Sequence, residues 1–168
     1  MGAAHVNSGA QRHTGSRTPD AAVQVFVGIG SNVGDRAAHV AHGLQQMAAL
    51  PQTTLVQCSQ VIQTEPVGPP GQGPYLNAVA ELRTMLAPAV LLDALLAIER
   101  QRGRDRTREV RFGPRTLDLD ILLYSDWQVD EPHLRIPHPR MPERPFVLVP
   151  LAEIAPSVAA RVRTTAIH

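Results

Sequence analysis

Two acidic residues in an alternating segment are the strongest candidates for chemistry in this sequence. The segment RTLDLDILLY (residues 115–124) alternates apolar and polar side chains, a period of two that predicts a half-buried strand. Asp118 and Asp120 therefore project from the same strand face, with Cα atoms roughly 6–7 Å apart. That spacing lets their carboxylates converge on one divalent cation, or on two about 3.5–4 Å apart. The opposite face is expected to be core: Leu117, Leu119, Ile121 and Leu123.

An acidic pair is also common on an ordinary solvated strand face, so the flanking residues must decide. Arg115 places a guanidinium just before the pair. Upstream of it, residues 100–111 (RQRGRDRTREVR) are rich in arginine and glycine, which predicts a mobile basic loop rather than a helix. Such a charge run is usually a solvated surface. Here it ends at the acidic strand, where it could close over a polyphosphate bound through metal.

A second candidate binding element is the loop EPVGPPGQGP (residues 65–74), which joins expected strands at 53–64 and 75–82. A hairpin needs only two to five residues, so a loop of this length favours a binding role. Tyr75 and Asn77 share one face of the following strand and offer an aromatic plane beside an amide. A flat, donor- and acceptor-rich ligand would suit them. The alternative is a packed tyrosine and an asparagine that stabilises a turn.

Composition limits the classes of protein that fit. The 168 residues are 43% hydrophobic, enough for one domain with a core. Lys+Arg 16 nearly balance Asp+Glu 15, so nothing global favours a nucleic-acid or membrane partner. The single cysteine excludes a disulfide framework. No signal peptide or membrane-spanning run is visible in the sequence, so we expect a cytoplasmic protein. We also expect it to be a monomer.

The elements that must position these residues follow the order β-α-β-β-α-β. Strands are expected at 24–30, 53–64, 75–82 and 115–124, with helices ending before Pro51 and beginning at Pro88. This order predicts an α+β fold with a ferredoxin-like core: a four-stranded antiparallel sheet with flanking helices. Residues 1–22 are expected to be a disordered extension, and residues 23–168 a single domain. A small hairpin is expected at 127–136 and an apolar segment at 147–151; no pattern is visible beyond Pro156.

Four ordered motifs carry a resemblance to a known family. They are GSNVGD (30–35), TEPVG with YLN (64–68, 75–77), FGPRTLDLDILL (112–123), and IPHPRM with RPF (136–141, 144–146). Together they resemble the 6-hydroxymethyl-7,8-dihydropterin pyrophosphokinases of folate biosynthesis, and the likeness runs from about residue 25 to residue 156. Phe112 stands where that family usually has tryptophan, and the arginine loop is about one residue longer than in some members.

The resemblance implies an activity and a role for each matching residue. The activity is transfer of pyrophosphate from ATP to a reduced pterin alcohol, with ATP as co-substrate and two Mg²⁺ ions as cofactors. The implied metal ligands are Asp118 and Asp120, which would act with Arg104 and Arg115 in catalysis. The implied ATP-binding residues are Glu99, Arg106, Ile121, His138 and Arg144. The implied pterin-binding residues are Thr64, Pro66, Val67, Tyr75, Asn77, Phe112 and Phe146.

Two alternatives of other classes remain open from sequence. One is a non-catalytic ferredoxin-like module that binds a small ligand, which leaves the acidic pair and His138 without a role. The other is an RNA-binding domain that uses the arginine run. That reading calls for aromatic residues on adjacent strands, whereas aromatics are only 4% of the chain.

Overall fold

The computed structural model describes residues 10–105, 107–111 and 113–166. The strands are β1 Gln11–Arg12, β2 Val23–Ser31, β3 Thr53–Cys58, β4 Ile62–Thr64, β5 Tyr75–Thr84, β6 Asp118–Tyr124, β7 Trp127–Glu131 and β8 Leu134–Ile136. The helices are α1 Arg36–Ala48, α2 Pro88–Gln101, α3 Pro145–Ile154 and α4 Pro156–Thr165, with a 3₁₀ turn at Met141–Glu143. The α+β class is as predicted. Within these residues no helix is long and apolar enough to cross a membrane.

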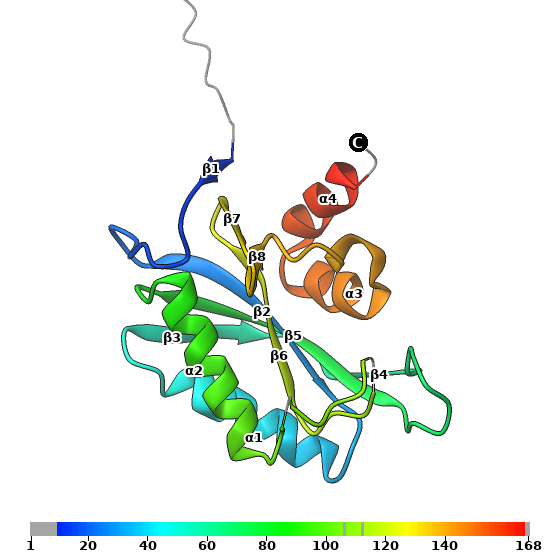
Figure 1. Cartoon of the computed structure of the whole chain (residues 1–168). Helices are drawn as coiled ribbons and strands as arrows, with labels where there is room; N and C mark the ends of the chain where they lie inside the picture. The colour runs from blue at the N-terminus through cyan, green and yellow to red at the C-terminus, as the bar shows by residue number, and fades with distance from the viewer. Residues whose placement is uncertain (1–9, 106, 112, 167–168) are drawn as a thin grey trace, which may run out of the picture.

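The main sheet, counted over the described residues, has five antiparallel strands (Figure 1). Its path is β3-β5-β2-β6, and β4 also pairs with β5. The sequence predicted four strands because residues 53–64 look like one strand. The chain breaks that strand at Ser59, whose amide donates to the Val79 carbonyl and whose hydroxyl accepts from the Val79 amide. Both pieces then pair with β5, so the predicted four-stranded sheet becomes five-stranded.

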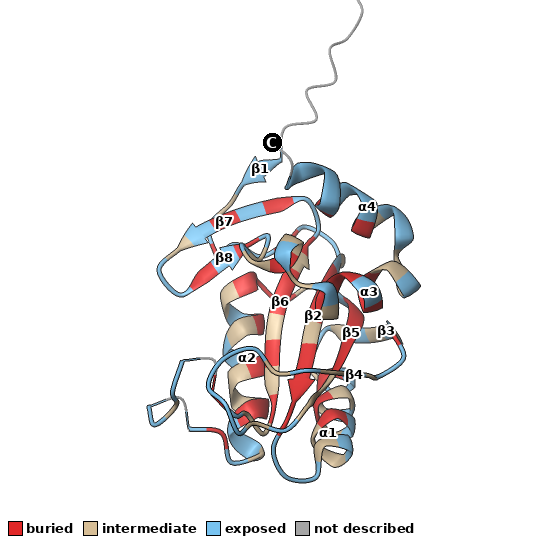
Figure 2. Cartoon of the chain, turned by 90° about the vertical axis from the view of Figure 1, so that its right-hand side faces the viewer, coloured by how far each residue is buried: buried red, intermediate tan, exposed pale blue. Residues whose placement is uncertain are grey.

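Helices α1 and α2 cover one face of this sheet (Figure 1). Helix α1 begins at Asp35, whose carboxylate accepts from the Ala38 amide at 3.1 Å as an N-cap. Each helix turns an apolar stripe inward, and full burial of each such side chain stabilises the fold by about 1.5–3 kcal/mol. The buried stripe residues are Val40 and Met47 of α1 with Leu91, Leu95 and Ile98 of α2. Figure 2 shows that buried residues also run along the central strands β2, β5 and β6.

The opposite face is covered in part by α3 and α4. A β-bulge in β6 places both Leu122 and Leu123 on this side: Val27 pairs with Ile121 but Phe26 with Leu123, so Leu122 is the extra residue. Leu122 is buried among Phe26 and the helices of this face, while Tyr124 returns to the α1–α2 core. The predicted alternation is therefore right through Leu122. It is wrong for Leu123, which is only partly buried and packs on the α3 side, and for Tyr124, which lies in the α1–α2 core.

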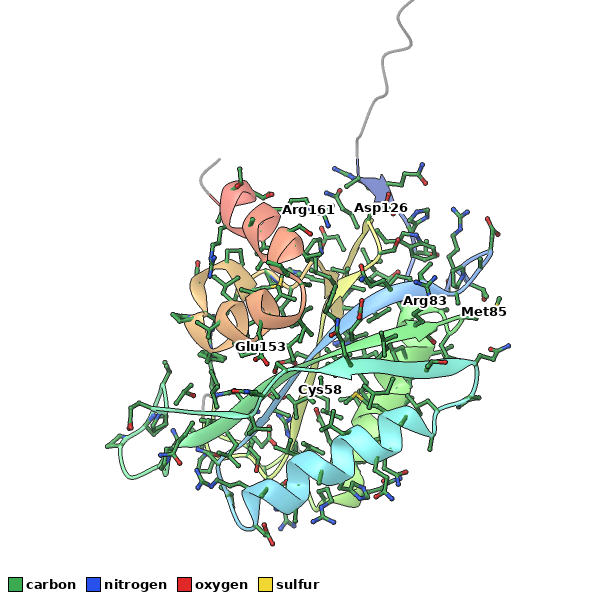
Figure 3. The ribbon with its side chains drawn as sticks, turned by 180° about the vertical axis from the view of Figure 1, so that it is seen from behind. Cys58, Arg83, Met85, Asp126, Glu153 and Arg161 are labelled. Atoms are coloured by element: carbon green, nitrogen blue, oxygen red, sulfur yellow. The ribbon has the colours of Figure 1, made fainter. Side chains whose placement is uncertain are left out.

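The sequence missed both C-terminal helices. The apolar segment at 147–151 lies in α3, and residues beyond Pro156 form α4. A short run that is apolar on all sides has no helical period, so its sequence does not distinguish a helix from a strand. Glu153 fixes α3 to the β3–β4 bend, since both its carboxylate oxygens lie 3.1 Å from the Gln60 amide. Figure 3 shows Glu153 close to Cys58, whose pKa is raised by burial and then by that carboxylate.

The segment before β2 packs on the fold, in contrast to the expected disorder up to residue 22. Strand β1 pairs in parallel with β7, which forms the predicted hairpin with β8. The His13 ring lies 4.0 Å from the Trp127 ring, and the Arg17 guanidinium lies 5.7 Å from the centre of that indole. The Gly15 amide donates to Glu131 at 2.7 Å. Residues 10–22 thus cover Trp127, whereas residues 1–9 lie outside the described part.

Candidate active site

The part of the sheet that α3 and α4 leave open has a floor made of backbone. Gly28 and Gly30 of β2 lie at its centre, opposite Asp120 and Asp118 of β6 respectively. On the other side, Gly30 pairs with Asn77 of β5. A Cβ on Gly30 would lie 3.2 Å from Asn77 Oδ1, tighter than an ordinary contact. Glycine at this position therefore leaves room above the sheet between the acidic pair and the amide.

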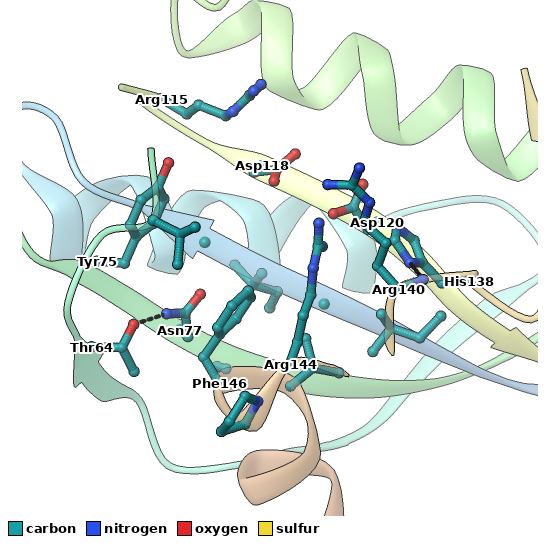
Figure 4. A pocket seen from close by; sticks show the side chains of 18 of the residues that line it. Thr64, Tyr75, Asn77, Arg115, Asp118, Asp120, His138, Arg140, Arg144 and Phe146 are labelled. Atoms are coloured by element: carbon teal, nitrogen blue, oxygen red, sulfur yellow. Dashed lines mark hydrogen bonds between the residues drawn. The ribbon is translucent and has the colours of Figure 1, made fainter. Parts of the chain in front are cut away.

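A cavity of about 500 Å³ lies over this floor. Figure 4 shows the two aspartates on β6, Thr64 and Asn77 facing them across the cavity, and Arg144 and Phe146 reaching in from the start of α3. The lining brings together most of the predicted residues: Thr64, Val67, Tyr75, Asn77, Arg104, Arg115, Asp118, Asp120, His138, Arg144 and Phe146. Segments far apart in the sequence therefore converge on the acidic strand, as the motifs predicted.

A second cavity of about 430 Å³ adjoins the first. Its walls come from α2, β6 and the β7–β8 hairpin. They combine apolar residues such as Leu92, Leu96 and Ile121 with the polar residues His133 and Arg135. Asp120 and His138 line both cavities. These two side chains therefore stand at the junction, and Ile121, an expected ATP contact, belongs to the second cavity.

The β4–β5 side of the first cavity is suited to a flat heteroaromatic ligand. Asn77 is 6% exposed, and its Nδ2 donates to Thr64 Oγ1 at 2.5 Å, which fixes the amide plane. The Tyr75 hydroxyl donates to the Gly113 carbonyl at 3.3 Å, and burial, then the Asp118 charge, raises the pKa of this phenol. Phe146 supplies a further ring, with the Arg144 guanidinium 5.5 Å from its centre. The tyrosine stays neutral, so this side offers two aromatic rings and a fixed amide, with the Arg144 guanidinium as the charge beside Phe146.

Arg104 was predicted to lie on a mobile loop that closes over the site, but in this structure its side chain is buried. It is 6% exposed and bound by three carboxylates: Nη1 lies 3.1 Å from Glu99 Oε1 and 2.7 Å from Asp118 Oδ1, and Nη2 donates to Glu109 Oε2 at 3.1 Å. Burial alone would lower the arginine pKa, but the hydrogen bond to Glu109 and the nearby carboxylates outweigh it and raise it. In this state Arg104 is a buried centre of charge that fixes the loop on β6.

Glu99, expected to line the ATP site, lies behind the acidic strand instead. Its side chain is 1% exposed, and Oε2 accepts from the Leu119 amide at 2.9 Å. It lines neither cavity. A charged residue at the end of α2 looks like a surface residue in sequence, and only the β6 backbone and Arg104 around it explain its burial. In this structure Glu99 contacts the β6 backbone and Arg104, and its role in ATP binding stays a prediction.

Asn32 anchors the start of the acidic segment to the end of β2. Its side-chain Oδ1 accepts from the Arg115 backbone amide at 2.8 Å, and its backbone amide donates to the Arg115 carbonyl at 3.0 Å. Asn32 Nδ2 also donates to Gln72 in the long proline–glycine loop at 3.1 Å. This residue therefore joins both loops that border the cavity. Sequence reasoning missed it as a site residue, although the motif GSNVGD contains it.

His138 is neutral at pH 7 in this site. Its backbone amide donates to the Leu122 carbonyl at 2.9 Å, which holds it against β6 at the bulge. Burial, then the charge of Arg144, lowers its pKa to about 4. The Arg140 amide donates to His138 Nδ1 at 3.1 Å, so the imidazole proton must lie on Nε2. His138 can therefore donate one hydrogen bond from Nε2 without carrying charge.

The carboxylates fit a metal that is shared with a ligand better than one enclosed by protein. Among the described residues no group of three or more His, Cys, Asp or Glu side chains could hold a metal ion. Asp118 and Asp120 nevertheless face the same cavity from one strand. Mg²⁺ typically binds through one or two carboxylates, keeps several waters and completes its shell with substrate phosphates. The donor set suits that arrangement.

Comparison with known proteins decides the family. The family model of 7,8-dihydro-6-hydroxymethylpterin-pyrophosphokinase (HPPK) matches residues 26–156 of the sequence. The chain belongs to this family. It is 46% identical over 135 residues to the 2-amino-4-hydroxy-6-hydroxymethyldihydropteridine pyrophosphokinase of Pseudomonas aeruginosa, covering 80% of this chain and 82% of the relative. It is 43% identical over 133 residues to the enzyme of that name from Bacillus subtilis, covering 79% and 78%.

A solved HPPK-DHPS structure in complex with substrates has the same fold as this HPPK chain. The TM-score is 0.60 at 12% identity, covering 80% of this chain and 40% of that longer protein.

Besides Glu99, three predicted site residues are not placed at either cavity. Arg106 and Phe112 lie outside the described residues, and Pro66 lines neither cavity. Sequence reasoning also missed Glu109, Arg140 and Glu143. Arg140 and Glu143 line the first cavity. The available signal was that Arg140 lies within the motif IPHPRM and Glu143 lies between it and RPF.

Proposed function

We propose that this HPPK chain transfers pyrophosphate from ATP to 6-hydroxymethyl-7,8-dihydropterin and releases AMP, a step of tetrahydrofolate biosynthesis. The observation that carries the proposal is that the acidic pair lies in a cavity that adjoins a second one. The first cavity combines rings, a fixed amide and arginines, and the second combines leucine and isoleucine residues of α2 and β6 with His133 and Arg135. Asp120 and His138 stand where the two meet. A ligand with a heteroaromatic alcohol on one side and a nucleoside triphosphate on the other would fill both.

The residues suggest how the substrates lie. The pterin would occupy the Tyr75–Asn77 side, with its ring near Phe146 and its edge hydrogen-bonded to Asn77 Oδ1. The nucleoside would enter the cavity lined by Leu92 and Ile121. Volumes of about 500 and 430 Å³ match the usual range for sites of small ligands. The triphosphate would then cross the junction beside the acidic pair.

The chemistry needs position and charge neutralisation more than a protein nucleophile. The pterin hydroxyl oxygen forms a bond to the β-phosphorus as the bond from that phosphorus to the oxygen bridging the α-phosphate breaks. AMP leaves with that oxygen, and the hydroxyl proton is lost to solvent. Two Mg²⁺ ions held by Asp118 and Asp120 would neutralise phosphate charge when bound. His138 would donate from Nε2 to a phosphate oxygen, and the fixed donors act without reorganising.

The remaining expectations join the proposal. The order β2-α1-β3-β5-α2-β6 supports a ferredoxin-like βαββαβ core, with β4 as an added strand. We expect a single catalytic domain from residue 23 onward, acting as a cytoplasmic monomer without a nucleic-acid or membrane partner. Near-neutral charge, Lys+Arg 16 against Asp+Glu 15, supports the last expectation. Light scattering of the purified chain at micromolar concentration tests the monomer.

The decisive experiment measures AMP after the protein is mixed with ATP, Mg²⁺ and the reduced pterin alcohol. We expect AMP only when all three are present, and loss of product when a chelator removes Mg²⁺. Asp120→Asn should lower the rate by about 100-fold or more, because it removes a charge at the metal and phosphates. Asp126→Asn is the matched control, since Asp126 is an exposed acid in the turn between β6 and β7 and lines neither cavity.

Two outcomes would contradict the proposal. If the protein bound ATP and the pterin tightly but formed no AMP, it would be a ligand-binding module rather than a transferase. If Asp120→Asn kept a near-normal rate at saturating Mg²⁺, the acidic pair would not be the metal site. The pterin dependence separates pyrophosphate transfer from simple hydrolysis of ATP, which would not require the alcohol.

A further inference from the structure

We propose that Glu109 is an internal competitor of the triphosphate, a carboxylate that occupies the guanidinium groups of Arg104 and Arg115 in the empty protein and leaves when phosphate binds. The inference rests on the proposed function, because it names what the substrate's phosphates must displace. It concerns a residue in the loop between α2 and β6 that no sequence motif singled out.

The geometry is that of a carboxylate bridging two arginines. Glu109 Oε1 accepts from Arg104 Nε at 2.5 Å, and Oε2 accepts from Arg104 Nη2 at 3.1 Å. The same Oε2 accepts from Arg115 Nη1 at 2.8 Å. Paired N–H donors of this kind bind carboxylate and phosphate oxygens with the same bidentate geometry. Glu109 therefore occupies the donor positions that a phosphate group would need.

Arg104 has little left to offer a substrate while Glu109 stays. Its Nη1 already donates to the Leu117 carbonyl and to Asp118, with Glu99 also within 3.1 Å. The side facing Glu109, formed by Nε and Nη2, is thus the side a phosphate could take over. Both arginines line the first cavity together with Asp118 and Asp120, so a phosphate held beside the acidic pair would lie near them.

Of the carboxylates on Arg104, Glu109 is the one suited to leave. Glu99 is 1% exposed and is fixed by the Leu119 amide. Asp118 belongs to β6. Glu109 is more exposed than Glu99, at 17%, and unlike Asp118 it lies on a loop outside the regular elements. Water can therefore solvate it once it is released. Its negative charge would also repel phosphate if it stayed, which gives bound triphosphate a reason to favour the released state.

The proposed role and a purely structural role predict opposite changes in triphosphate affinity when Glu109 is removed. If Glu109 only holds the two arginines in place, its removal should loosen them and weaken triphosphate binding. If it competes, the apparent affinity is reduced by the fraction of molecules in which the arginines are occupied, and its removal should strengthen binding. The direction of change in affinity therefore separates the two.

The test is calorimetric titration of the full chain with α,β-methylene-ATP and Mg²⁺, comparing wild type with Glu109→Gln. We expect the dissociation constant to fall by about tenfold in the variant. Glu109→Asp, with a shorter carboxylate that reaches one arginine less well, should lie between the two. The matched control is Asp105→Asn, which changes an exposed acid of the same loop that pairs with Arg108 at 3.5 Å. This control should leave the dissociation constant within about twofold.

Three results would overturn the competition. They are an unchanged or weaker affinity in Glu109→Gln, an equal gain in Asp105→Asn, and a Glu109→Asp variant that binds as tightly as Glu109→Gln. Thermal unfolding of each variant identifies loss of fold, and a Glu109→Gln chain that unfolds would show a scaffold role and also overturn the proposal. AMP formation by the wild type is measured in parallel. Normal AMP formation with any of these results refutes the competition alone, whereas no AMP and no analogue binding refutes the proposed function.

Discussion

Replacing Arg104 with methionine should remove a large part of the stability of the fold, because it leaves a carboxylate buried without its cation. Glu99 is 1% exposed and lies 3.1 Å from Arg104 Nη1. Breaking one partner of a buried pair typically costs about 3–5 kcal/mol, against a total unfolding free energy of about 5–15 kcal/mol for a domain. The contacts of Arg104 with Glu109 and Asp118 should add less, since these carboxylates are 17% and 28% exposed and water can replace the arginine.

Urea unfolding at neutral pH measures this loss from the midpoint and slope of the transition. Arg108→Met is the matched control, because Arg108 is 87% exposed and its pair with Asp105 is also at the surface. That control should change stability by no more than about 0.5 kcal/mol. The double variant Arg104→Met with Glu99→Gln should recover most of the loss, since the glutamine oxygen can still accept from the Leu119 amide and carries no charge.

Two results would refute this reasoning. A loss below about 1 kcal/mol for Arg104→Met would show that Glu99 is not desolvated as its burial implies. A double variant no more stable than the single one would place the loss in packing around the guanidinium stem rather than in the unpaired charge.

Two further predictions concern the cavity floor and His138. Gly30→Ala should weaken binding of the pterin alcohol by about 1 kcal/mol in calorimetry, because its Cβ would lie 3.2 Å from Asn77 Oδ1 and disturb that acceptor; Gly28→Ala, whose Cβ would meet Leu122 at 3.4 Å, should change it little, and equal losses would contradict the argument. His138 has a folded pKa of about 4 against about 6.5 unfolded, so the unfolded state takes up its proton first and stability falls as pH drops from 6.5 to 4. His138→Asn should reduce that fall by about 1–3 kcal/mol, allowing for partial exposure, in urea unfolding at pH 7 and pH 4.5; an unchanged difference between the two pH values would exclude the buried neutral state.

The site was more predictable from sequence than the fold around it. Asp118 and Asp120 were found from a period of two, because strand geometry alone puts them on one face. Tyr75 and Asn77 were grouped by the same rule, and both line the first cavity. These inferences hold because they depend on neighbours within one strand.

The features that were missed depend on contacts between distant segments. The bulge at Leu122 arises from the register between β2 and β6, which the sequence of β6 does not contain. The burial of Glu99 needs the Leu119 amide, 20 residues away. Helix α3 carries an apolar residue even on its exposed face, where Val149 is 54% exposed, so the segment 147–151 has no period to detect. The bridge from Glu109 to Arg104 and Arg115 requires the loop to fold back on β6.

The backbone floor of the cavity has a consequence for how resistance to an inhibitor could arise. Gly28 and Gly30 line the cavity, so a ligand over them would contact main chain, and no side chain there can be shortened or exchanged for one of another chemistry. Any substitution at these positions adds atoms, as the 3.2 Å approach to Asn77 at Gly30 shows. An inhibitor that stays within the volume of the pterin against this floor would be excluded only by changes that also exclude the substrate. Contacts made there should be harder to escape by mutation than contacts made with the side chains of α3.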